Sequence, residues 1–298
     1  MQKPSFSSSA SSPGSLDAAL IARVGGYIRE KSLFTEADRV LCLVSGGADS
    51  IAMLRLLQAL SSTGAAGLPR GFPLGVCHVN YGRRGEESNV DESFVRSVGD
   101  ELGLTVHAIR APVEQHSNFQ AWARDFRYLA AQNLCRWQGY TRIAVAHNLD
   151  DRIETFIYRL ITYSGRRSIV VMPPRRGHVV RPLLFLTADE IRGYCRQNHI
   201  AWREDASNRS LAYTRNQIRQ LVLPCLAEIR PAYRQHIIDT PALLEDEAEA
   251  LQSVTDDACP SPYASFDGPA YLQAPALTIT PQAHARRATR APRAPPAA

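Results

Sequence analysis

The sequence predicts an α/β protein with a doubly wound parallel sheet, followed by a smaller helical region. Short apolar segments alternate with longer segments of helical periodicity through residues 38–161, and glycine-rich or polar loops follow the apolar segments. Alternation at this spacing is typical of right-handed βαβ units, in which helices cover both faces of a parallel sheet. Ligands of such sheets bind at the carboxyl ends of the strands, where these loops fall.

Each predicted strand is a short apolar run, and each is followed by a segment of helical periodicity. The strands are predicted at 38–44, 73–79, 104–110 and 142–146. The helices that follow them are predicted at 51–60, 86–102, 120–137 and 150–161. In the second of these helices, Val90, Val98 and Leu102 recur on one face, which indicates packing against the sheet.

The pattern changes after residue 170. A proline-containing turn at 171–174 precedes a helix from about Thr187, a residue suited to the N-cap position, to Asn198. Helix-like sequence then continues to about residue 257, and an Ala-, Pro- and Arg-rich stretch typical of disorder ends the chain. We therefore expect a disordered tail at 1–15, a catalytic domain at 16–200, a helical region at 201–260 and a second disordered tail at 261–298.

Composition excludes several classes of protein. Of the 298 residues, 45% are hydrophobic and 21% are charged, as expected for a soluble globular protein. No apolar run is long enough for a transmembrane helix, and the Ser-rich N-terminus lacks the apolar stretch of a secretory signal. The six cysteines form no C-x-x-C pair. A disulfide framework, a zinc site and a membrane partner are therefore not expected, and the pattern fits the reducing cytoplasm.

Charge is distributed unevenly along the chain. Residues 236–280 are acidic and contain no Lys or Arg, whereas residues 281–298 and, more strongly, residues 1–235 carry a positive excess. A basic body favours a polyanionic partner such as nucleic acid. Because Lys3 and Lys31 are the only lysines, a genome rich in arginine codons is the alternative explanation.

A glycine-rich loop separates the first predicted strand from its helix. The loop reads Ser45-Gly46-Gly47-Ala48-Asp49-Ser50. Two glycines allow a tight turn that brings backbone N–H groups close to a ligand, and the following helix directs the positive end of its dipole there. These features make a cradle for a phosphate or pyrophosphate. The Asp49 carboxylate would repel a phosphate, so its presence in this loop indicates that Mg²⁺ lies between the two. The alternative is an incidental glycine-rich turn.

Charged residues also gather after the fourth strand and on the helix before it. Asp150, Asp151 and Glu154 fall within about one helical turn, a cluster that is unfavourable unless Mg²⁺ or a substrate ammonium binds it. Acidic residues that complement the helix dipole are the alternative. Arg124 and Arg127 share a helix face, which suits phosphate or a developing negative charge, unless they are surface ion-pair partners.

One further arginine pair points to a phosphate backbone, and another lies in a loop placed to contact adenine and ribose. Arg215 and Arg219 are four residues apart on a predicted helix, so they form a basic stripe that can bridge RNA phosphates. Arg83 and Arg84 lie in the loop after the second strand. Solvated surface arginines are the alternative interpretation of both pairs.

The loop at 45–50 matches the pattern S-G-G-x-D-S and resembles the PP-loop of the N-type ATP pyrophosphatases, an adenine nucleotide alpha hydrolase-like family. The resemblance implies that ATP is cleaved between its α and β phosphates and that AMP is transferred. It implies ATP binding by Ser45, Gly46, Gly47, Ala48, Asp49 and Ser50, together with His78 and Asn80 after the second strand. It also implies Mg²⁺ at Asp49 and Asp150.

Later segments resemble motifs of the tRNA(Ile)-lysidine synthase family, and the resemblance covers roughly residues 38–235. The matching segments are His78–Ser88 (H-V-N-H-G-L-R-G-E-E-S), Ala123–Tyr128 (A-R-x-x-R-Y), His147–Thr155 (H-H-x-D-D-x-x-E-T), Arg181–Leu184 (R-P-L-L) and Asp205–Arg219 (D-x-S-N-x-x-x-x-Y-x-R-N-x-I-R). Tyr81 and Arg83 replace a His and a Leu of the first motif, and Asn148 replaces the second His of the third. The segment 162–171 keeps only Ser164-Gly165 of its family pattern.

This resemblance implies a cytoplasmic ligase that joins free L-lysine to C2 of the wobble cytidine in the isoleucine tRNA with a CAU anticodon, through an adenylated base. It implies four catalytic residues: Asp49, Arg124, Asp151 and Glu154. It implies lysine binding by Asp151, Glu154 and His147. The implied tRNA-binding residues, which extend into the helical region, are Arg84, Arg127, Arg181, Asn208, Arg215, Asn216 and Arg219. A homodimer is also expected.

Two other functions stay open at this point. A tRNA thiolase of the same superfamily needs a catalytic cysteine pair or a metal-binding cysteine cluster, and distant cysteines of this chain could meet in space. A non-catalytic tRNA-binding paralogue is suggested by Asn148 and by the altered segment 162–171. Longer family members carry a C-terminal RNA-binding domain, which the acidic residues after 236 do not resemble.

Overall fold

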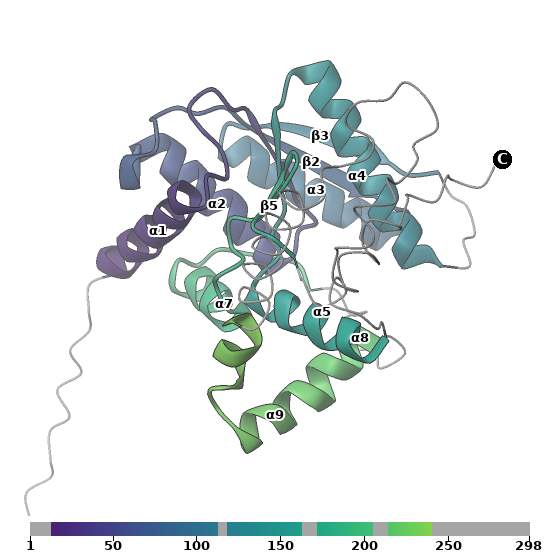
Figure 1. Ribbon diagram of the computed structural model, residues 1–298. Coiled ribbons are helices and arrows are strands. Elements are labelled where there is room, and N and C mark those ends of the chain that lie inside the picture. Colours follow the sequence, from purple (N-terminus) through teal and green to yellow (C-terminus); the bar gives the residue numbers. More distant parts are fainter. Residues whose placement is uncertain (1–12, 113–117, 163–171, 205–213, 240–298) are drawn as a thin grey trace, which may run out of the picture.

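The computed structural model describes residues 13–112, 118–162, 172–204 and 214–239 (Figure 1). Its sheet has the order β3-β2-β1-β4-β6-β5, and every pair is parallel except β5 with β6. The strands are β1 Val40–Leu43, β2 Leu74–Asn80, β3 Thr105–Arg110, β4 Arg142–Ala144, β5 Arg175–Arg176 and β6 Val179–Val180. The predicted doubly wound parallel sheet is therefore confirmed.

Helices connect the strands and extend the chain beyond the sheet. They are α1 Pro13–Glu30, α2 Ala48–Thr63, α3 Glu86–Glu101, α4 Phe119–Gln138, α5 Leu149–Thr162, α7 Ala188–Gln197, α8 Thr214–Gln217 and α9 Leu223–Ile229. A π-helical turn, Ile218–Val222, joins α8 to α9, and residues 233–239 are also helical. Helix α1 begins inside the tail that we expected up to residue 15.

Apolar residues on alternate sides of β1 explain why helices cover both faces of the sheet. Val40 and Cys42 belong to one buried cluster, to which α1, α2, α3 and α7 contribute. Leu41 and Leu43 belong to a second cluster on the other face, to which α4 contributes. The sheet is thus fixed from both sides, and the loops at its edge have a rigid base.

The C-terminal helices form a smaller unit against α5. Ile218, Leu223 and Tyr233 pack on Ile153 and Ile157 of α5 in a third cluster. In Figure 1 these helices, drawn in green, lie beside α5 and α7 and away from β3. The helix-like sequence that we expected through this region is helical in the structure, with a π-helical turn and the Arg230–Pro231 break between its helices. The rest of that prediction, beyond residue 239, lies outside the described residues.

No helix in the described ranges has the length and apolar character needed to cross a lipid bilayer. The five cysteines that the structure describes are all free.

Gly75 on β2 gives a prediction about packing. A Cβ there would lie 2.0 Å from the hydroxyl oxygen of Tyr140, which also binds Nε2 of His107 at 3.0 Å. Gly75→Ala should therefore lower the free energy of unfolding by about 1–3 kcal/mol through overpacking. Urea denaturation measures the change. Gly26→Ala in α1 is the control, since its Cβ meets nothing within 4 Å, and it should stabilise by about 0.5–1 kcal/mol.

Candidate active site

The loops after β1 and β4 meet at the point where the strand order reverses. β1 lies between β2 and β4, so one connection runs to each side and a crevice opens at the carboxyl ends of β1 and β4. The loop 45–50 follows β1, and residues 145–151 follow β4. The sequence motifs with the clearest chemistry therefore converge on one edge of the sheet.

The loop 45–50 is braced by its own serines. Gly46 has φ +97°, a conformation that favours glycine. The Ser50 hydroxyl donates to the Gly47 carbonyl at 3.0 Å and accepts from the Ser45 N–H at 3.2 Å. Gly47 is the N-cap of α2 and provides no side-chain cap. The first N–H groups of α2 are thus left for an anion, as in other phosphate-binding helix termini.

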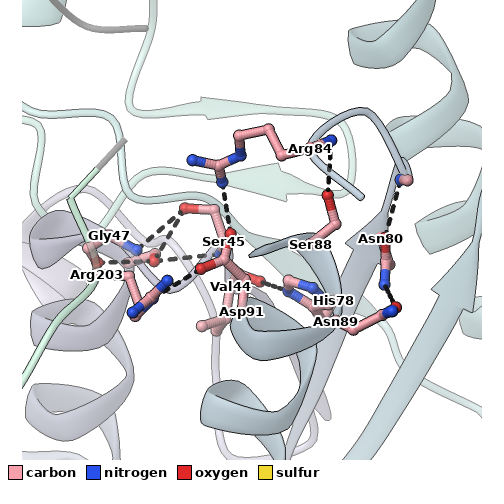
Figure 2. A network of polar contacts seen from close by, with 12 residues as sticks. Val44, Ser45, Gly47, His78, Asn80, Arg84, Ser88, Asn89, Asp91 and Arg203 are labelled. Atoms are coloured by element: carbon pink, nitrogen blue, oxygen red, sulfur yellow. Dashed lines mark hydrogen bonds and ion pairs between the residues drawn. The ribbon is translucent and has the colours of Figure 1, made fainter. Parts of the chain in front are cut away.

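A carboxylate with two arginines lies beside this loop (Figure 2). The Arg203 N–H donates to the Gly46 carbonyl at 2.9 Å, and Arg203 Nε donates to Asp91 Oδ1 at 2.8 Å. Arg84 Nη2 donates to the other oxygen of Asp91. Arg84, which we expected to contact tRNA, is therefore held at the phosphate loop. Sequence reasoning missed Asp91 and Arg203, although Arg203 lies two residues before the motif at 205–219.

His78 and Asn80 are buried supports of the same edge. His78 Nδ1 lies 2.9 Å from the Val44 carbonyl. Asn80 donates to Asn89 and to Glu92, and it accepts from the Gly82 N–H. Both side chains are 4% exposed. His78 joins β2 to the end of β1, whereas Asn80 joins the end of β2 to α3 and to its own loop. A direct contact of either side chain with ATP stays a prediction.

An acidic cavity of about 250 Å³ lies between α2, α5, α7 and the C-terminal helices. Four carboxylates and three guanidiniums line it: Asp49, Asp150, Glu154, Asp189, Arg192, Arg219 and Arg234. The buried Glu154 carboxylate is held by Arg219, with Nη2 to Oε2 at 3.0 Å and Nε to Oε1. The charged groups lining this cavity leave an excess of one negative charge.

Asp49 contributes to that excess. Burial and the neighbouring Asp151 carboxylate raise the pKa of Asp49 to about 6, against opposing effects of Arg192 and of a hydrogen bond from Asn148. Asp49 forms no ion pair within the described part of the chain. A carboxylate in this state is suited to a cation.

Asp150, the second expected metal ligand, is already engaged. Its Oδ2 accepts from the Ala188 N–H at 2.7 Å, and its Oδ1 lies 2.7 Å from Arg234 Nη1. Among the described residues, no group of three His, Cys, Asp or Glu side chains is arranged to hold a metal. The residues fit Mg²⁺ bound through Asp49 and oxygens from phosphate and water, since Mg²⁺ keeps several waters and takes few protein carboxylates.

Asp151 lies in the first turn of α5 and faces Arg219 of the C-terminal helices. Its Oδ2 accepts from the Asn148 N–H at 3.1 Å, and its own N–H donates to Asn148 Oδ1 at 2.9 Å. Asn148, which departs from the family pattern, thus caps α5 through a reciprocal pair of bonds. Asp151 Oδ1 also lies 3.4 Å from Arg219 Nη2.

A basic cavity of about 950 Å³ opens on the other side of α5. Six arginines line it: Arg124, Arg127, Arg159, Arg176, Arg181 and Arg215. Tyr81, Phe119, Tyr128 and Tyr158 add aromatic surface, and no carboxylate is among the lining residues that the structure describes. Arginines with aromatic rings form the combination that binds nucleotides and unpaired RNA.

His147 lines the basic cavity, not the acidic one. Burial and the surrounding guanidiniums lower the pKa of His147 to about 3, so its imidazole is neutral. Those guanidiniums belong to Arg181, Arg127, Arg215 and Arg124. The expected lysine-binding set is therefore divided: Glu154 faces the acidic cavity, and His147 lies among cations that disfavour an ammonium.

The expected basic stripe of Arg215 and Arg219 is wrong. Arg215 lines the basic cavity, whereas Arg219 lines the acidic cavity and pairs with Glu154. Arg215 lies on α8, whereas Arg219 lies inside the π-helical turn that begins at the buried Ile218, and this turn changes the spacing of the side chains. Asn216 lies on α8 near this turn, and Asn208 lies outside the described residues.

Comparison with known proteins agrees with this geometry. A family model described as a PP-loop domain matches residues 21–226, and this places the chain in the PP-loop class of nucleotide-binding domains. The tRNA(Ile)-lysidine synthase of Bacteroides thetaiotaomicron is 35% identical, over 79% of this chain and 54% of its own length. That of Petrotoga mobilis is 33% identical, over 70% of this chain and 67% of its own. The chain belongs to the tRNA(Ile)-lysidine synthase family of PP-loop proteins.

Two further comparisons set the limits of this match. The tRNA(Ile)-lysidine synthase of Dehalococcoides mccartyi is 34% identical, and the matched region spans 52% of it. The chain thus spans about half the length of several curated relatives that it matches. The solved structure of the U34-tRNA thiolase NcsA from Methanococcus maripaludis has a TM-score of 0.62 at 16% identity, over 77% of this chain and 80% of that one. This likeness shows a shared fold.

Proposed function

We propose that the chain is the catalytic part of an ATP-dependent tRNA(Ile)-lysidine synthase, acting in the cytoplasm on the isoleucine tRNA with a CAU anticodon. The observation that carries the proposal is the pair of oppositely charged cavities on the two sides of α5, of which the acidic one is also lined by Asp49 of the phosphate loop. A reaction that joins a cationic amine to a polyanion needs both kinds of site close together. Homodimer formation stays a prediction.

ATP would bind with its outer phosphates on the N–H groups at the start of α2. Asp49 would hold Mg²⁺ there, and the ion would neutralise charge on the pyrophosphate as it leaves. Gly46 and Gly47 keep the backbone close to the phosphates. Arg203 and Asp91 keep the loop in this shape through the bonds described above.

The wobble cytidine would enter the basic cavity, unstacked from its neighbours, as chemistry on a base requires. Its O2 would attack the α-phosphate, pyrophosphate would leave, and the base would become an adenylate. Arg124, at the wall of this cavity, would stabilise the negative charge that develops on the α-phosphate. Arg127, Arg181 and Arg215 would bind the RNA backbone.

Lysine would place its ammonium against the excess negative charge of the acidic cavity. Burial raises the pKa of Glu154, which suits this carboxylate to take the proton that the ammonium must lose. The free amine would then attack C2 of the adenylated cytidine and expel AMP. Asp151, which shares Arg219 with Glu154, would assist the same step.

Incubation with labelled lysine, ATP-Mg and a tRNA transcript with a CAU anticodon tests the proposal. Label should appear at the wobble position, and it should require both ATP and tRNA. Label that appears when ATP or tRNA is left out would contradict the proposal. Incorporation of sulfur in place of lysine would favour a tRNA thiolase. A transcript in which the wobble cytidine is replaced by uridine is the matched control.

Arg203→Ala should raise the KM for ATP by roughly tenfold, because a charged hydrogen bond to the buried Asp91 is lost. Arg203→Lys should restore part of the affinity for ATP, since Arg203 makes a single side-chain bond to Asp91, from Nε at 2.8 Å, and an ammonium can also donate one charged bond. Pyrophosphate release over a range of ATP concentrations measures the effect. Arg96→Ala, an exposed partner of Glu92 on α3, is the control. An unchanged KM for ATP in the Arg203 variants would contradict the role given to this residue.

A further inference from the structure

Four aromatic side chains form a continuous row at one edge of the molecule. Phe119, Trp122 and Phe126 lie on one face of α4, and Tyr81 joins them from the loop after β2. Trp122 and Phe126 are stacked, with centroids 5.4 Å apart at 27°. Phe119 lies 5.7 Å from Trp122 and 5.6 Å from Tyr81. All four residues are partly exposed, and partly exposed aromatic groups of this size mark interaction sites.

The row continues into the wall of the basic cavity. Tyr81 and Phe119 line that cavity together with Arg124 and Arg127 of the same helix. The Tyr81 hydroxyl donates to the Ala123 carbonyl at 2.7 Å, which fixes the tyrosine ring on α4. The rings are thus held in place before any partner arrives.

An arginine already occupies one ring face. The Arg83 guanidinium carbon lies 4.2 Å from the centroid of the Phe119 ring, a cation–π contact. Planar guanidinium groups and nucleobases stack on aromatic rings in the same way. The Arg83 contact indicates that a flat group can lie over Phe119.

The positive charge of the adjoining cavity favours RNA as the partner of these rings. Within the described ranges, six arginines and no carboxylate line the adjoining cavity. A lipid tail or an apolar peptide would gain nothing from these arginines, whereas unpaired RNA offers phosphates for the guanidiniums and bases for the rings.

We propose that Tyr81, Phe119, Trp122 and Phe126 form a stacking platform for the unpaired nucleotides that flank the reacting base, with Arg83 at its end. The proposal rests on the proposed function, because it takes the RNA to be the substrate that enters the basic cavity. Stacking of a base on an aromatic ring contributes to affinity for RNA, and loss of one ring should weaken RNA binding about 5- to 100-fold.

Tryptophan fluorescence tests stacking directly. The chain has three tryptophans, Trp122, Trp137 and Trp202, so the double variant Trp137→Phe/Trp202→Phe leaves Trp122 as the reporter. A dye-labelled single-stranded RNA of the anticodon-loop sequence should quench this fluorescence over the same concentrations at which its own anisotropy rises. Inorganic polyphosphate should bind to the arginines without quenching.

The outcomes separate the two proposals. If the RNA binds by anisotropy and leaves Trp122 fluorescence unchanged, the stacking platform is wrong and the proposed function stands. If the RNA does not bind at all, both fail. If polyphosphate quenches Trp122 fluorescence as much as RNA does, the stacking platform is also wrong, because the quenching would then follow from bound negative charge and not from stacked bases.

Kinetics provide a second measurement. Trp122→Ala should raise the KM for tRNA about 5- to 100-fold and leave the KM for ATP unchanged, and Trp122→Phe should restore it. Trp137→Ala is the matched control, because Trp137 is on the same helix and is 75% exposed. If Trp122→Ala fails to fold, Phe119→Leu tests the same surface with a side chain that keeps apolar volume. If a folded Trp122→Ala or Phe119→Leu variant has the same KM for tRNA as the wild-type protein, the proposal is contradicted.

Discussion

Asp49→Asn is expected to abolish pyrophosphate release and, at the same time, to raise the free energy of unfolding at pH 7. The pKa of Asp49 is raised from its usual 3.8 to about 6 by burial and by Asp151, so the folded state prefers the protonated carboxyl. The stability that this preference contributes is present below pH 4 and is lost as pH rises through 6. At pH 7 the charged form is destabilising by about 2 kcal/mol after allowance for partial exposure.

Urea denaturation at pH 5 and pH 7, in buffer with a metal chelator, measures this effect. The wild-type protein should lose stability between the two values, and the loss should be smaller in the Asp49→Asn variant. Mg²⁺ at pH 7 should stabilise the wild-type protein more than the variant, because the ion neutralises the same charge. Asp100→Asn, at an exposed position of α3, is the control. A variant that is less stable than the wild type at pH 7 would contradict the account of Asp49.

Arg219→Ala is expected to lower the free energy of unfolding by about 3 kcal/mol. The Glu154 side chain is 3% exposed, and removal of its guanidinium partner leaves a buried carboxylate without compensation. The double variant Arg219→Ala/Glu154→Gln should recover much of this loss, since the charge is then absent. Denaturation of the two single variants and the double variant completes the cycle.

Arg55 offers a matched control for Arg219. It forms a two-bond pair with Glu101 at 2.7 and 2.6 Å, but the Glu101 side chain is 59% exposed. Arg55→Ala should therefore cost less than about 1 kcal/mol. Equal costs for the two arginine variants would show that burial of the carboxylate is not the cause of the Arg219 effect.

The sequence predicted those parts of the fold that local pattern determines. The strands at 38–44, 73–79, 104–110 and 142–146 are confirmed, and three of them are shorter than predicted. They were predictable because a short apolar run between polar loops is typical of a strand in a parallel sheet. The capped helix at Thr187 is confirmed with both bonds of its capping box. The hairpin of β5 and β6 was missed, because two-residue strands carry no periodicity.

The site was predictable where neighbours in sequence form it. The loop 45–50 has the expected turn at Gly46, since glycine spacing specifies it locally. The pairing of Arg219 with Glu154 joins positions 65 residues apart, and no periodicity reveals it. The same holds for Arg203 and Asp91, 112 residues apart. Such pairs depend on how the C-terminal segments fold back over the sheet edge.

The wall that α5 forms between the two cavities has a kinetic consequence. Thr155 faces the arginine-lined side, and Glu154 faces the carboxylate-lined side, although the two are adjacent on one helix. Under the proposed function, lysine and tRNA bind on different sides of α5, and neither has to wait for the other. Steady-state rates should then follow a random order of addition, and a compound that fills the larger cavity should compete with tRNA but not with lysine.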